Sequence, residues 1–320
     1  MDLVIVGSMG YDDIETPEAS GSDILGGSAV HAGVSASFHL PEVPGRIKRV
    51  GLVSPIGEDF SENHQNMLEG LGMDFSGVVR LPGKTFRWSG RYEGSMENVE
   101  TISTEVNVLG DFHPKIPDSW TSPKVLFCAN THPSSQIAVL DQCPNSEITA
   151  VDTFMLWIET EFEQLSLALR KSDIAILNEE EVCAISSEEI FTKAIGPILS
   201  GAALHGGESA GSGPRGLVIK RGSSGVFAHL PCGIIALPAF PVDEVMDPTG
   251  CGDSFAGALL ANMAGRKGVL YDLESMRAAM VHAIVTSSFT IGGLGSKNLQ
   301  GLERGAYHAR MDRYRRIVGL

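Results

Sequence analysis

The chain has 320 residues, of which 43% are hydrophobic and 37 are glycines, and its formal net charge at pH 7 is −15. This length allows one large α/β domain or two small ones, and the composition is typical of a globular protein rich in tight turns. The negative charge opposes binding to nucleic acid and to anionic membranes, so we expect neither as a partner. No apolar run approaches the roughly 18–20 residues that are needed to span a bilayer.

The N-terminus and the cysteines predict a cytoplasmic protein. The first residues, Met1-Asp2-Leu3-Val4-Ile5-Val6-Gly7, lack the basic segment and cleavage site of a signal peptide and indicate a buried first strand. The five cysteines form no C-x-x-C motif, and we expect them to be free thiols in a reducing cytosol. The nine histidines include no pair at metal-site spacing, which argues against a structural zinc site.

Short apolar runs alternate with helix-periodic segments along most of the chain. The runs that we expect to be buried parallel strands are Val4–Val6, Val50–Val53, Val125–Cys128, Ile148–Val151, Ile174–Leu177 and Leu217–Ile219. The helices expected among them span about 28–38, 59–71, 134–142, 159–170, 179–199, 252–265 and 273–290. This alternation predicts an α/β fold in which a doubly wound, mostly parallel sheet has helices on both faces.

One segment interrupts this alternation. From Lys84 to Leu109 the pattern is strand-like, with a turn near Gly94–Asn98 and no helix between the two halves, which predicts an inserted hairpin. Residues 11–25, between the first strand and the first helix, are expected to add another strand or two. We predict that these two segments form a small β-sheet. It would serve as a lid over a ligand cleft, as a dimer interface, or as both.

The most informative motif is Asp247-Pro248-Thr249-Gly250-Cys251-Gly252-Asp253, which leads into an Ala-rich helical run. Its glycines and the following helix N-terminus would direct backbone N–H groups at one spot, which suits an anion that gains charge during a reaction. A carboxylate beside such a spot would repel a resting phosphate unless it had a proton to remove. The pattern predicts phosphoryl transfer to a hydroxyl, with Asp253 as general base and Gly250–Gly252 as the anion-hole segment. The alternative is a plain turn whose first-turn Asp complements the helix dipole.

This motif resembles the C-terminal signature of the PfkB/ribokinase family of carbohydrate and nucleoside kinases, usually D-T-x-G-A-G-D, with Cys251 where Ala is usual. The resemblance extends along the chain and implies one kinase domain over residues 1–320, with a ribokinase-like fold. It implies ATP and Mg²⁺ as cofactors and a small-molecule acceptor. It is also compatible with a homodimer formed through the lid, since hairpin lids in this family often, but not always, pair into dimers. Because position 251 would contribute its backbone N–H, a small Cys should be tolerated, although its thiol would be an oxidation liability.

The family commonly has a monovalent-cation site beside the anion hole. Asp247 and Thr249 match two of its usual positions, so the resemblance also implies K⁺ as a cofactor.

The acceptor pocket is expected at the start of the first helix. Gly26, Gly27 and Ser28 match the family's Gly-Gly motif, which lines the pocket of the acceptor sugar. Two glycines allow a close approach of the backbone to a polyol, and Ser28 can cap the helix or contact the polyol. His31 stands where the family often has Asn. The alternative for this segment is a simple entry from a loop into a helix.

Three further residues are predicted to contact the acceptor. Asp12 matches the family's acceptor-binding carboxylate, whose two oxygens suit vicinal hydroxyls; the alternative is a solvated loop Asp. Arg87, between Phe86 and Trp88 on the predicted lid, is either solvated or closes on the acceptor or on a phosphate that it carries. Asn130, just after a predicted strand, is a further acceptor contact.

The nucleotide side is predicted from two motifs. Asn178 and Glu181 match the family's N-x-x-E motif, which orients the water network of magnesium and phosphate; hard oxygen ligands acting through water fit Mg²⁺. Acidic residues in a first helical turn also occur on dipole grounds alone. A second motif, with Lys220, Gly222 and Gly225, resembles the family's K-x-G-x-x-G nucleotide turn. His282, on a later predicted helix, is expected to border the adenine.

The resulting prediction is an ATP-dependent kinase that phosphorylates a primary alcohol group of a sugar or sugar-like small molecule. A nucleoside is the alternative acceptor, since Trp88 or Phe86 would stack on its base. A non-catalytic sugar or nucleotide sensor is a second alternative, against which the intact Asp253 argues. A dinucleotide oxidoreductase is disfavoured, because the cofactor fingerprint is missing.

Overall fold

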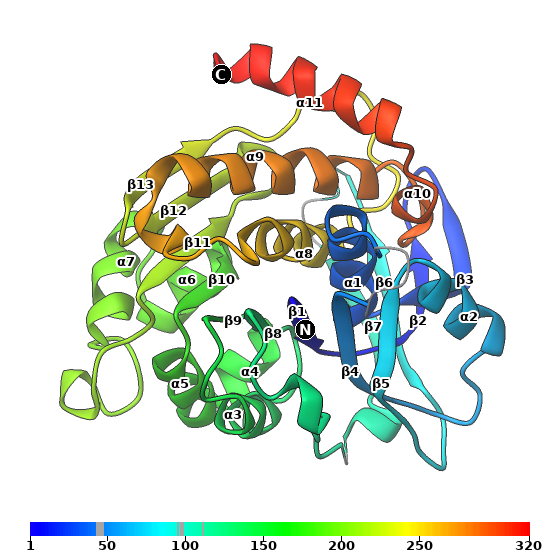
Figure 1. Cartoon of the computed structure of the whole chain (residues 1–320), viewed down its shortest axis with the longest axis horizontal. Coiled ribbons are helices and arrows are strands. Elements are labelled where there is room, and N and C mark those ends of the chain that lie inside the picture. The colour runs from blue at the N-terminus through cyan, green and yellow to red at the C-terminus, as the bar shows by residue number, and fades with distance from the viewer. Residues whose placement is uncertain (43–47, 95, 97–98, 111) are drawn as a thin grey trace.

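The computed structural model describes residues 1–42, 48–94, 96, 99–110 and 112–320. Its main sheet has nine strands in the order β13-β12-β11-β10-β9-β8-β1-β4-β5 (Figure 1). The strands are β1 (Leu3–Val6), β4 (Val50–Ile56), β5 (Met73–Arg80), β8 (Val125–Cys128), β9 (Ile148–Val151), β10 (Ile174–Asn178), β11 (Gly216–Lys220), β12 (Val226–Leu230) and β13 (Gly233–Leu237). Pairing is parallel from β5 to β11, and β12 and β13 add an antiparallel hairpin. The predicted mostly parallel sheet is confirmed.

Helices cover both faces of this sheet, as predicted. Two buried clusters, one on each face, contain side chains from α1, α8, α9 and α11 in one and from α3, α5, α6 and α7 in the other. The helices are α1 (Ser28–His39), α2 (Glu62–Gly70), α3 (Pro133–Gln142), α4 (Met155–Thr160), α5 (Phe162–Lys171), α6 (Glu179–Ser186), α7 (Phe191–Ser200), α8 (Cys251–Met263), α9 (Leu273–Thr290), α10 (Lys297–Gln300) and α11 (Arg304–Val318). Figure 1 shows α11 outermost, lying over α9.

Two predicted helices are each divided in the structure. The segment 159–170 is split between α4 and α5 at Glu161, and the segment 179–199 is split between α6 and α7. The second break follows Ser187, which has a φ of 55° and therefore leaves the right-handed helical region. Helical periodicity continues across both breaks, so sequence pattern alone joined the pieces.

A separate sheet of four strands has the order β3-β2-β6-β7. It consists of β2 (Gly10–Glu15), β3 (Ser20–Gly26), β6 (Phe86–Tyr92) and β7 (Val99–Glu105), which fall in the two segments predicted to form the small sheet. The predicted turn at 94–98 lies partly outside the described residues. Every residue of β7 is exposed. We refer to these four strands as the small sheet.

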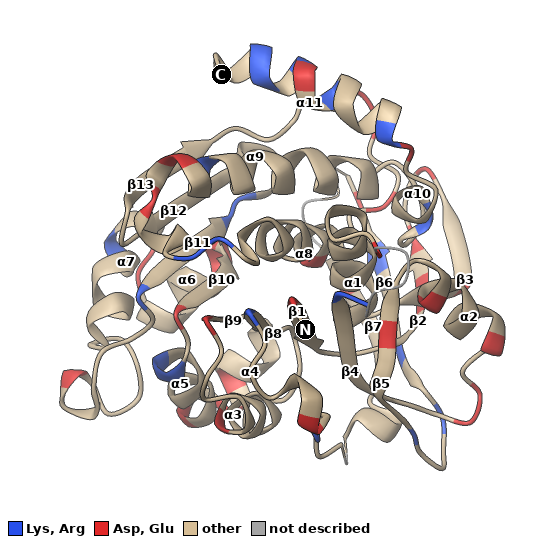
Figure 2. Ribbon diagram, viewed as in Figure 1, with Lys and Arg blue, Asp and Glu red and all other residues tan. Residues whose placement is uncertain are grey.

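The C-terminal helix carries basic positions along its length (Figure 2). One of them, Arg310, stacks its guanidinium over Phe289 at 3.6 Å from the ring centroid and donates to the Ser288 carbonyl at 2.8 Å. All five cysteines are free, as expected. Within the described part of the chain, each helix is too short or too polar to cross a membrane.

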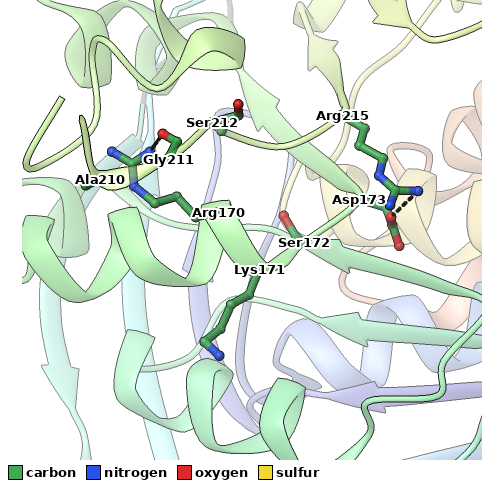
Figure 3. A pocket seen from close by; sticks show the side chains of 9 residues that line it. Arg170, Lys171, Ser172, Asp173, Ala210, Gly211, Ser212 and Arg215 are labelled. Atoms are coloured by element: carbon green, nitrogen blue, oxygen red, sulfur yellow. Dashed lines mark hydrogen bonds and ion pairs between the residues drawn. The ribbon is translucent and has the colours of Figure 1, made fainter. Parts of the chain in front are cut away.

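A polar pocket of about 460 Å³ lies where β10 and β11 begin, at the edge of the sheet opposite to the strand ends that carry the predicted site. Its cations already have partners, and Figure 3 shows those of Arg170 and Arg215. Arg170 donates to carbonyl oxygens of the loop after α7, those of Gly201, His205, Gly207 and Gly211. Lys171 pairs with Asp141 at 2.6 Å, and Arg215 pairs with Asp173 at 3.3 Å. At this pocket, therefore, the Arg170 side chain holds a Gly-rich loop in place through its carbonyl oxygens.

Candidate active site

The predicted functional residues gather where the main sheet reverses its strand order. The chain passes from β1 to β4 and β5 on one side and then returns to β8 on the other side of β1. In such sheets the crevice outside the carboxyl ends of the strands, next to this reversal, is the usual ligand site. Segments that follow β1, β8, β9 and β10 and the end of β11 meet there, opposite the start of α8.

The start of α8 has the features expected of an anion hole. Gly250 has a φ of 71°, and a Cβ on it would overlap the ring of His31, so only glycine fits this position. The N–H of Cys251 donates to the Pro248 carbonyl at 3.1 Å and is thus engaged within the turn. The hydrogen bonds found among the described residues include none from the N–H groups of Gly252 or Asp253. These two N–H groups lie at the helix N-terminus and have no acceptor in the described part of the protein.

Asp253 lies in the first turn of α8. Burial raises the pKa of its carboxyl to about 7; the charge of Asp152 adds to this shift and that of Lys220 opposes it. A carboxyl group with a pKa near neutrality can accept a proton and release it again at physiological pH. Its position beside free N–H groups and its raised pKa suit a general base.

Lys220, at the end of β11, is turned toward Asp152, which directly follows β9. Its Nζ lies 2.7 Å from Oδ2 of Asp152. A Cβ on Gly252 would lie 3.3 Å from the same Nζ, so the ammonium group also borders the start of α8. Sequence analysis did not identify Asp152. Its only signal is a single acidic residue directly after a predicted strand.

Asn178 and Glu181 form a reciprocal cap at the start of α6. The backbone N–H of Glu181 donates to Oδ1 of Asn178, and the backbone N–H of Asn178 donates to Oε2 of Glu181, both at 2.7 Å. Burial raises the pKa of Glu181 to about 8; the charge of Lys220 opposes this shift, and that of Asp152 adds to it. The motif therefore has a structural task that explains its residue types without a ligand.

The carboxylates fit Mg²⁺ only through water or phosphate. Asp152, Glu181 and Asp253 all act electrostatically on Lys220, so oxygen donors surround one small region. The described residues nevertheless contain no group of three or more His, Cys, Asp or Glu side chains close enough to hold a metal ion directly. Mg²⁺ keeps several waters and is usually bound by one or two carboxylates together with substrate phosphates. The residues present fit that mode of binding.

Asp12 lies on β2 and faces Gly26, the last residue of β3. A Cβ on Gly26 would overlap the carboxylate of Asp12, so the glycine allows this close approach. The Asp12 side chain is buried, and burial together with the charges of Asp247, Asp253 and Asp13 raises its pKa to about 8. Asp253 is one of the charges that raise this pKa, so the predicted acceptor residue and the predicted base lie within electrostatic range of each other.

The start of α1 is tied to the ends of β1 and β8. Gly27 has a φ of 98°, and a Cβ on it would lie 2.5 Å from the Ser8 carbonyl oxygen. The Ser28 hydroxyl accepts from the Ser8 N–H at 3.0 Å and donates to the Asn130 carbonyl at 3.1 Å. Ser28 is thus engaged in joining these segments.

His31 is buried, and neither of its ring nitrogens has a hydrogen-bond partner in the described part of the protein. Burial lowers its pKa to about 4, so the imidazole is neutral.

Asn130 is oriented by a tryptophan. Its Oδ1 accepts from the indole N–H of Trp157 at 2.9 Å, and the Trp157 ring packs against His132. Because an indole N–H can only donate, the amide NH₂ of Asn130 is the half that is left to contact a ligand.

Arg87 and His282 are engaged away from these groups. Arg87 pairs with Asp23 at 2.5 Å and with Asp59 at 3.7 Å. Its neighbour Trp88 pairs across the small sheet with Asp12, and adjacent strand residues face opposite sides, so Arg87 points to the face away from Asp12. The expected contact of Arg87 with the acceptor is therefore not supported. His282 bonds the Tyr307 hydroxyl at 2.5 Å, between α9 and α11, which occupies one of its ring nitrogens.

The glycines of the predicted nucleotide turn are required by its backbone. Gly222 and Gly225 have φ values of 52° and 93°, and a Cβ on Gly225 would overlap the Leu237 carbonyl oxygen. Both glycines thus adopt backbone conformations that other residues would strain, while the Lys220 side chain points to Asp152.

Asp247 joins two loops beside the start of α8. Its Oδ1 accepts from the Thr249 N–H and its Oδ2 from the Gly295 N–H, both at 2.8 Å. The Thr249 hydroxyl lies 3.1 Å from the Tyr92 hydroxyl, which connects this loop to the small sheet.

Burial raises the pKa of the Cys251 thiol to about 11, so the thiol is protonated at neutral pH and the predicted oxidation liability is small.

Comparison with known proteins identifies the family of the chain. The family pattern described as pfkB family carbohydrate kinase matches residues 25–291. Cytidine kinase from Thermococcus kodakarensis is 30% identical over 268 residues, which cover 82% of this chain and 88% of that protein.

Two solved structures show the same fold. The nucleoside kinase of Burkholderia thailandensis in complex with inosine has a TM-score of 0.75 and 17% identity, covering 98% of both chains. A protein described as ribokinase II from E. coli, in complex with ATP and Mg²⁺, has a TM-score of 0.72 and 19% identity, covering 97% of this chain and 99% of that one. The ribokinase-like fold is thereby confirmed. With the family match and the cytidine kinase relative, the chain belongs to the pfkB family of carbohydrate kinases and is a kinase of sugars or nucleosides.

Proposed function

We propose that this kinase transfers the γ-phosphoryl group of ATP to a primary hydroxyl of a nucleoside, with Asp253 as general base. The observation that carries this proposal is the position of Asp253 in the first turn of α8, with a pKa raised to about 7, beside N–H groups for which the described residues offer no acceptor. A base, an anion site and a cation, Lys220, thus lie together at the end of the parallel strands.

In the proposed reaction the acceptor oxygen forms a bond to the γ-phosphorus while the bond from that phosphorus to the β,γ-bridging oxygen breaks, which releases ADP. The acceptor proton passes to Asp253 and from there to solvent. The N–H groups of Gly252 and Asp253 stabilise charge on the equatorial oxygens. Mg²⁺, when bound, neutralises phosphate charge, and Glu181 would hold one of its waters.

The acceptor would be held by Asp12. A ribose offers vicinal hydroxyls that a carboxylate can bind with both oxygens. Trp88 lies opposite Asp12 in the pairing of the small sheet and faces the same side, where its ring can stack on a base. The similarity to a cytidine kinase also favours a nucleoside. Gly26, Gly27, His31 and the amide of Asn130 would complete this pocket.

A free sugar is the second candidate acceptor, since Asp12 binds hydroxyls whether or not a base is attached. An ADP-release assay over cytidine, inosine, other nucleosides, ribose and other sugars distinguishes the two. We expect turnover with at least one nucleoside at a lower KM than with ribose. Turnover restricted to free sugars would exclude the nucleoside proposal, and no turnover with any acceptor would favour a sensor.

The small sheet is proposed to be a lid and a dimer interface within one kinase domain spanning residues 1–320. Tyr92, at the end of β6, contacts Thr249 beside the anion-hole segment, which supports a lid. The outermost strand, β7, exposes Val99 and Ile102, with exposed fractions of 39% and 51%. A second copy can cover this edge. Light scattering should give a dimer mass that Ile102→Lys shifts toward the monomer, and a monomeric wild type would contradict the dimer.

A monovalent cation is proposed at Asp247 and Thr249. Asp247 is fully buried between two loops, and each of its two oxygens accepts one backbone N–H among the described residues, which leaves lone pairs for a cation. Activity in KCl should exceed activity in choline chloride at equal ionic strength, and equal activities would exclude this site.

A cytoplasmic location is supported by the five free thiols. The net charge of −15 supports the absence of nucleic-acid and membrane partners.

A further inference from the structure

A largely buried ion pair next to the start of α8 has a part in neither the base chemistry nor the acceptor pocket. The side chains of Lys220 and Asp152 are 18% and 4% exposed. Removing two charges from water is costly, and apolar residues often replace such pairs without loss of stability. A pair kept at this position therefore points to a task beyond folding.

Asp152 is held firmly by its surroundings. Its Oδ1 accepts from the Thr153 N–H at 2.8 Å, which leaves Oδ2 for Lys220. Its backbone carbonyl accepts from the side chain of the buried Gln136 at 2.8 Å, and its N–H donates to the Cys128 carbonyl at 2.9 Å. A lysine has a flexible four-carbon stem, so a fixed carboxylate determines where its ammonium group stays.

The ammonium group of Lys220 has hydrogen-bonding capacity to spare. Burial disfavours its charge, yet the carboxylates of Asp152, Glu181 and Asp253 raise its pKa, so it stays a cation. Of its three N–H groups, one has an acceptor among the described residues, Asp152. No side chain separates it from the backbone at Gly252, because a Cβ there would lie 3.3 Å from Nζ.

The adjacent cation behaves differently. Arg221 is drawn away from α8 by Glu179, which lies 2.6 Å from its Nε, and it stacks 4.4 Å above the Phe191 ring. Of these two neighbouring cations, Lys220 alone borders the anion-hole segment.

We propose that Lys220 binds the γ-phosphoryl group at the start of α8, and that Asp152 is the positioning residue that holds its ammonium group there. This inference rests on the kinase function proposed above. Charge-assisted hydrogen bonds from an ammonium to phosphate are among the stronger polar contacts, and a cation fixed before the reaction needs no rearrangement to stabilise the transferring group. The lysine of the nucleotide turn thus acts on the reacting phosphate.

The direct test compares two nucleotides that differ at the γ-position. Titration calorimetry would measure the Kd of ADP and of the non-hydrolysable analogue AMP-PNP, both with Mg²⁺. In Lys220→Met the affinity for AMP-PNP should fall by about tenfold or more, with less than about a threefold change for ADP. In Asp152→Asn the change should have the same direction, and Asp152→Glu should regain part of it. An equal loss for both nucleotides, or no loss for either, would overturn the proposal.

A double variant separates this role from a structural one. Lys220→Met with Asp152→Asn removes both buried charges at nearly constant volume and should fold even if a single variant does not. A purely structural pair would then give wild-type preference for AMP-PNP, whereas a phosphate-binding lysine predicts that the preference stays lost. Lys171→Met with Asp141→Asn is the matched control, since it removes another Lys–Asp pair, 2.6 Å long, at the far edge of the sheet. It should change neither Kd.

Failure of this proposal is distinguishable from failure of the proposed function. Nucleotide binding is measured without an acceptor, so it reports on Lys220 even if the acceptor class is wrong. If phosphoryl transfer is observed but the two Kd values move together, only the role of Lys220 and Asp152 is refuted.

Discussion

At the residue scale, the site combines three carboxyl groups whose pKa values are raised by burial. The values are about 8 for Asp12, about 8 for Glu181 and about 7 for Asp253. A carboxyl with a folded pKa above its unfolded value stabilises the fold fully below about pH 4 and loses that contribution as pH rises through the folded pKa. The groups that we assign to catalysis and binding therefore weaken the fold at alkaline pH.

Asp12→Asn tests this electrostatic cost. The substitution keeps the size of the side chain and removes a buried charge, so it should raise Tm by about 3–8 °C at pH 9 and change it little at pH 5. Thermal melts at the two pH values measure the effect. Asp312→Asn is the control, because Asp312 is exposed on α11 and should show no such difference. The same Tm change at both pH values would contradict a buried, ionising Asp12.

Individual residues differ in how far sequence could predict them. Asp253 and the glycines before it form one continuous motif, so their roles follow from adjacency alone. Lys220 and Asp152 are 68 residues apart, and a single Asp after a strand resembles any solvated loop residue. Arg87 lies next to Trp88 in sequence, yet the strand turns it to the opposite face, where it meets Asp23 and Asp59. The contacts that sequence could not predict are those between residues that only the fold brings together, such as Lys220 with Asp152.

At the element scale, short segments are held by specific backbone contacts rather than by propensity. The loop after α7 is rich in Gly and Ser, and Arg170 binds carbonyl oxygens at several points along it. One arginine thereby satisfies backbone groups that the loop cannot pair internally. Helical periodicity placed the helices well, but the breaks at Glu161 and Ser187 depend on tertiary packing and were not predicted.

Arg170→Met should release this loop. The side chain keeps part of its apolar length but loses all its donors, so limited proteolysis between 201 and 213 should become faster by about tenfold or more. Peptide mapping by mass spectrometry identifies the cleavage sites. Lys171→Met, which removes the adjacent cation without touching the loop carbonyls, should leave the cleavage rate unchanged. Unchanged cleavage in Arg170→Met would show that the loop is ordered by other contacts.

At the scale of the whole molecule, partly buried histidines join helices that are distant in sequence. His39 ends α1 and bonds Thr286 of α9 at 2.8 Å, while His282 of α9 bonds Tyr307 of α11. Burial lowers the pKa of His39 to about 3 and that of His282 to about 4. Each is neutral in the fold, so its contribution to stability is present above about pH 6.5 and is lost as pH falls toward the folded pKa.

His39→Gln should reduce this acid sensitivity. Glutamine keeps hydrogen-bonding capacity for Thr286 but does not titrate, so the free energy of unfolding should fall less between pH 7 and pH 4.5 than in the wild type. Urea unfolding at several pH values measures the difference, which we expect to be about 1–2 kcal/mol. His205→Gln is a suitable control because His205 is exposed. Parallel pH profiles for His39→Gln and the wild type would contradict a His39 that is neutral in the folded protein.

The architecture as a whole was largely predictable. Buried runs without alternation are typical of parallel strands, and all six that were predicted are present in the main sheet. The edge strands β5 and β13 expose part of their length, so their patterns are weaker, and they were missed together with β12. The ribokinase-like fold did not depend on them.

The central claim is that Asp253 removes the proton from the acceptor hydroxyl. Asp253→Asn should retain the wild-type Kd for ADP within about threefold while kcat, measured by ADP release with the best acceptor, falls by about 10²–10⁴-fold. Asp272→Asn is the matched control, since Asp272 also lies at a helix N-terminus, where it caps α9, and should not affect turnover. A loss of kcat with nucleotide binding intact is the result that we predict. Near-normal turnover by Asp253→Asn would contradict the account.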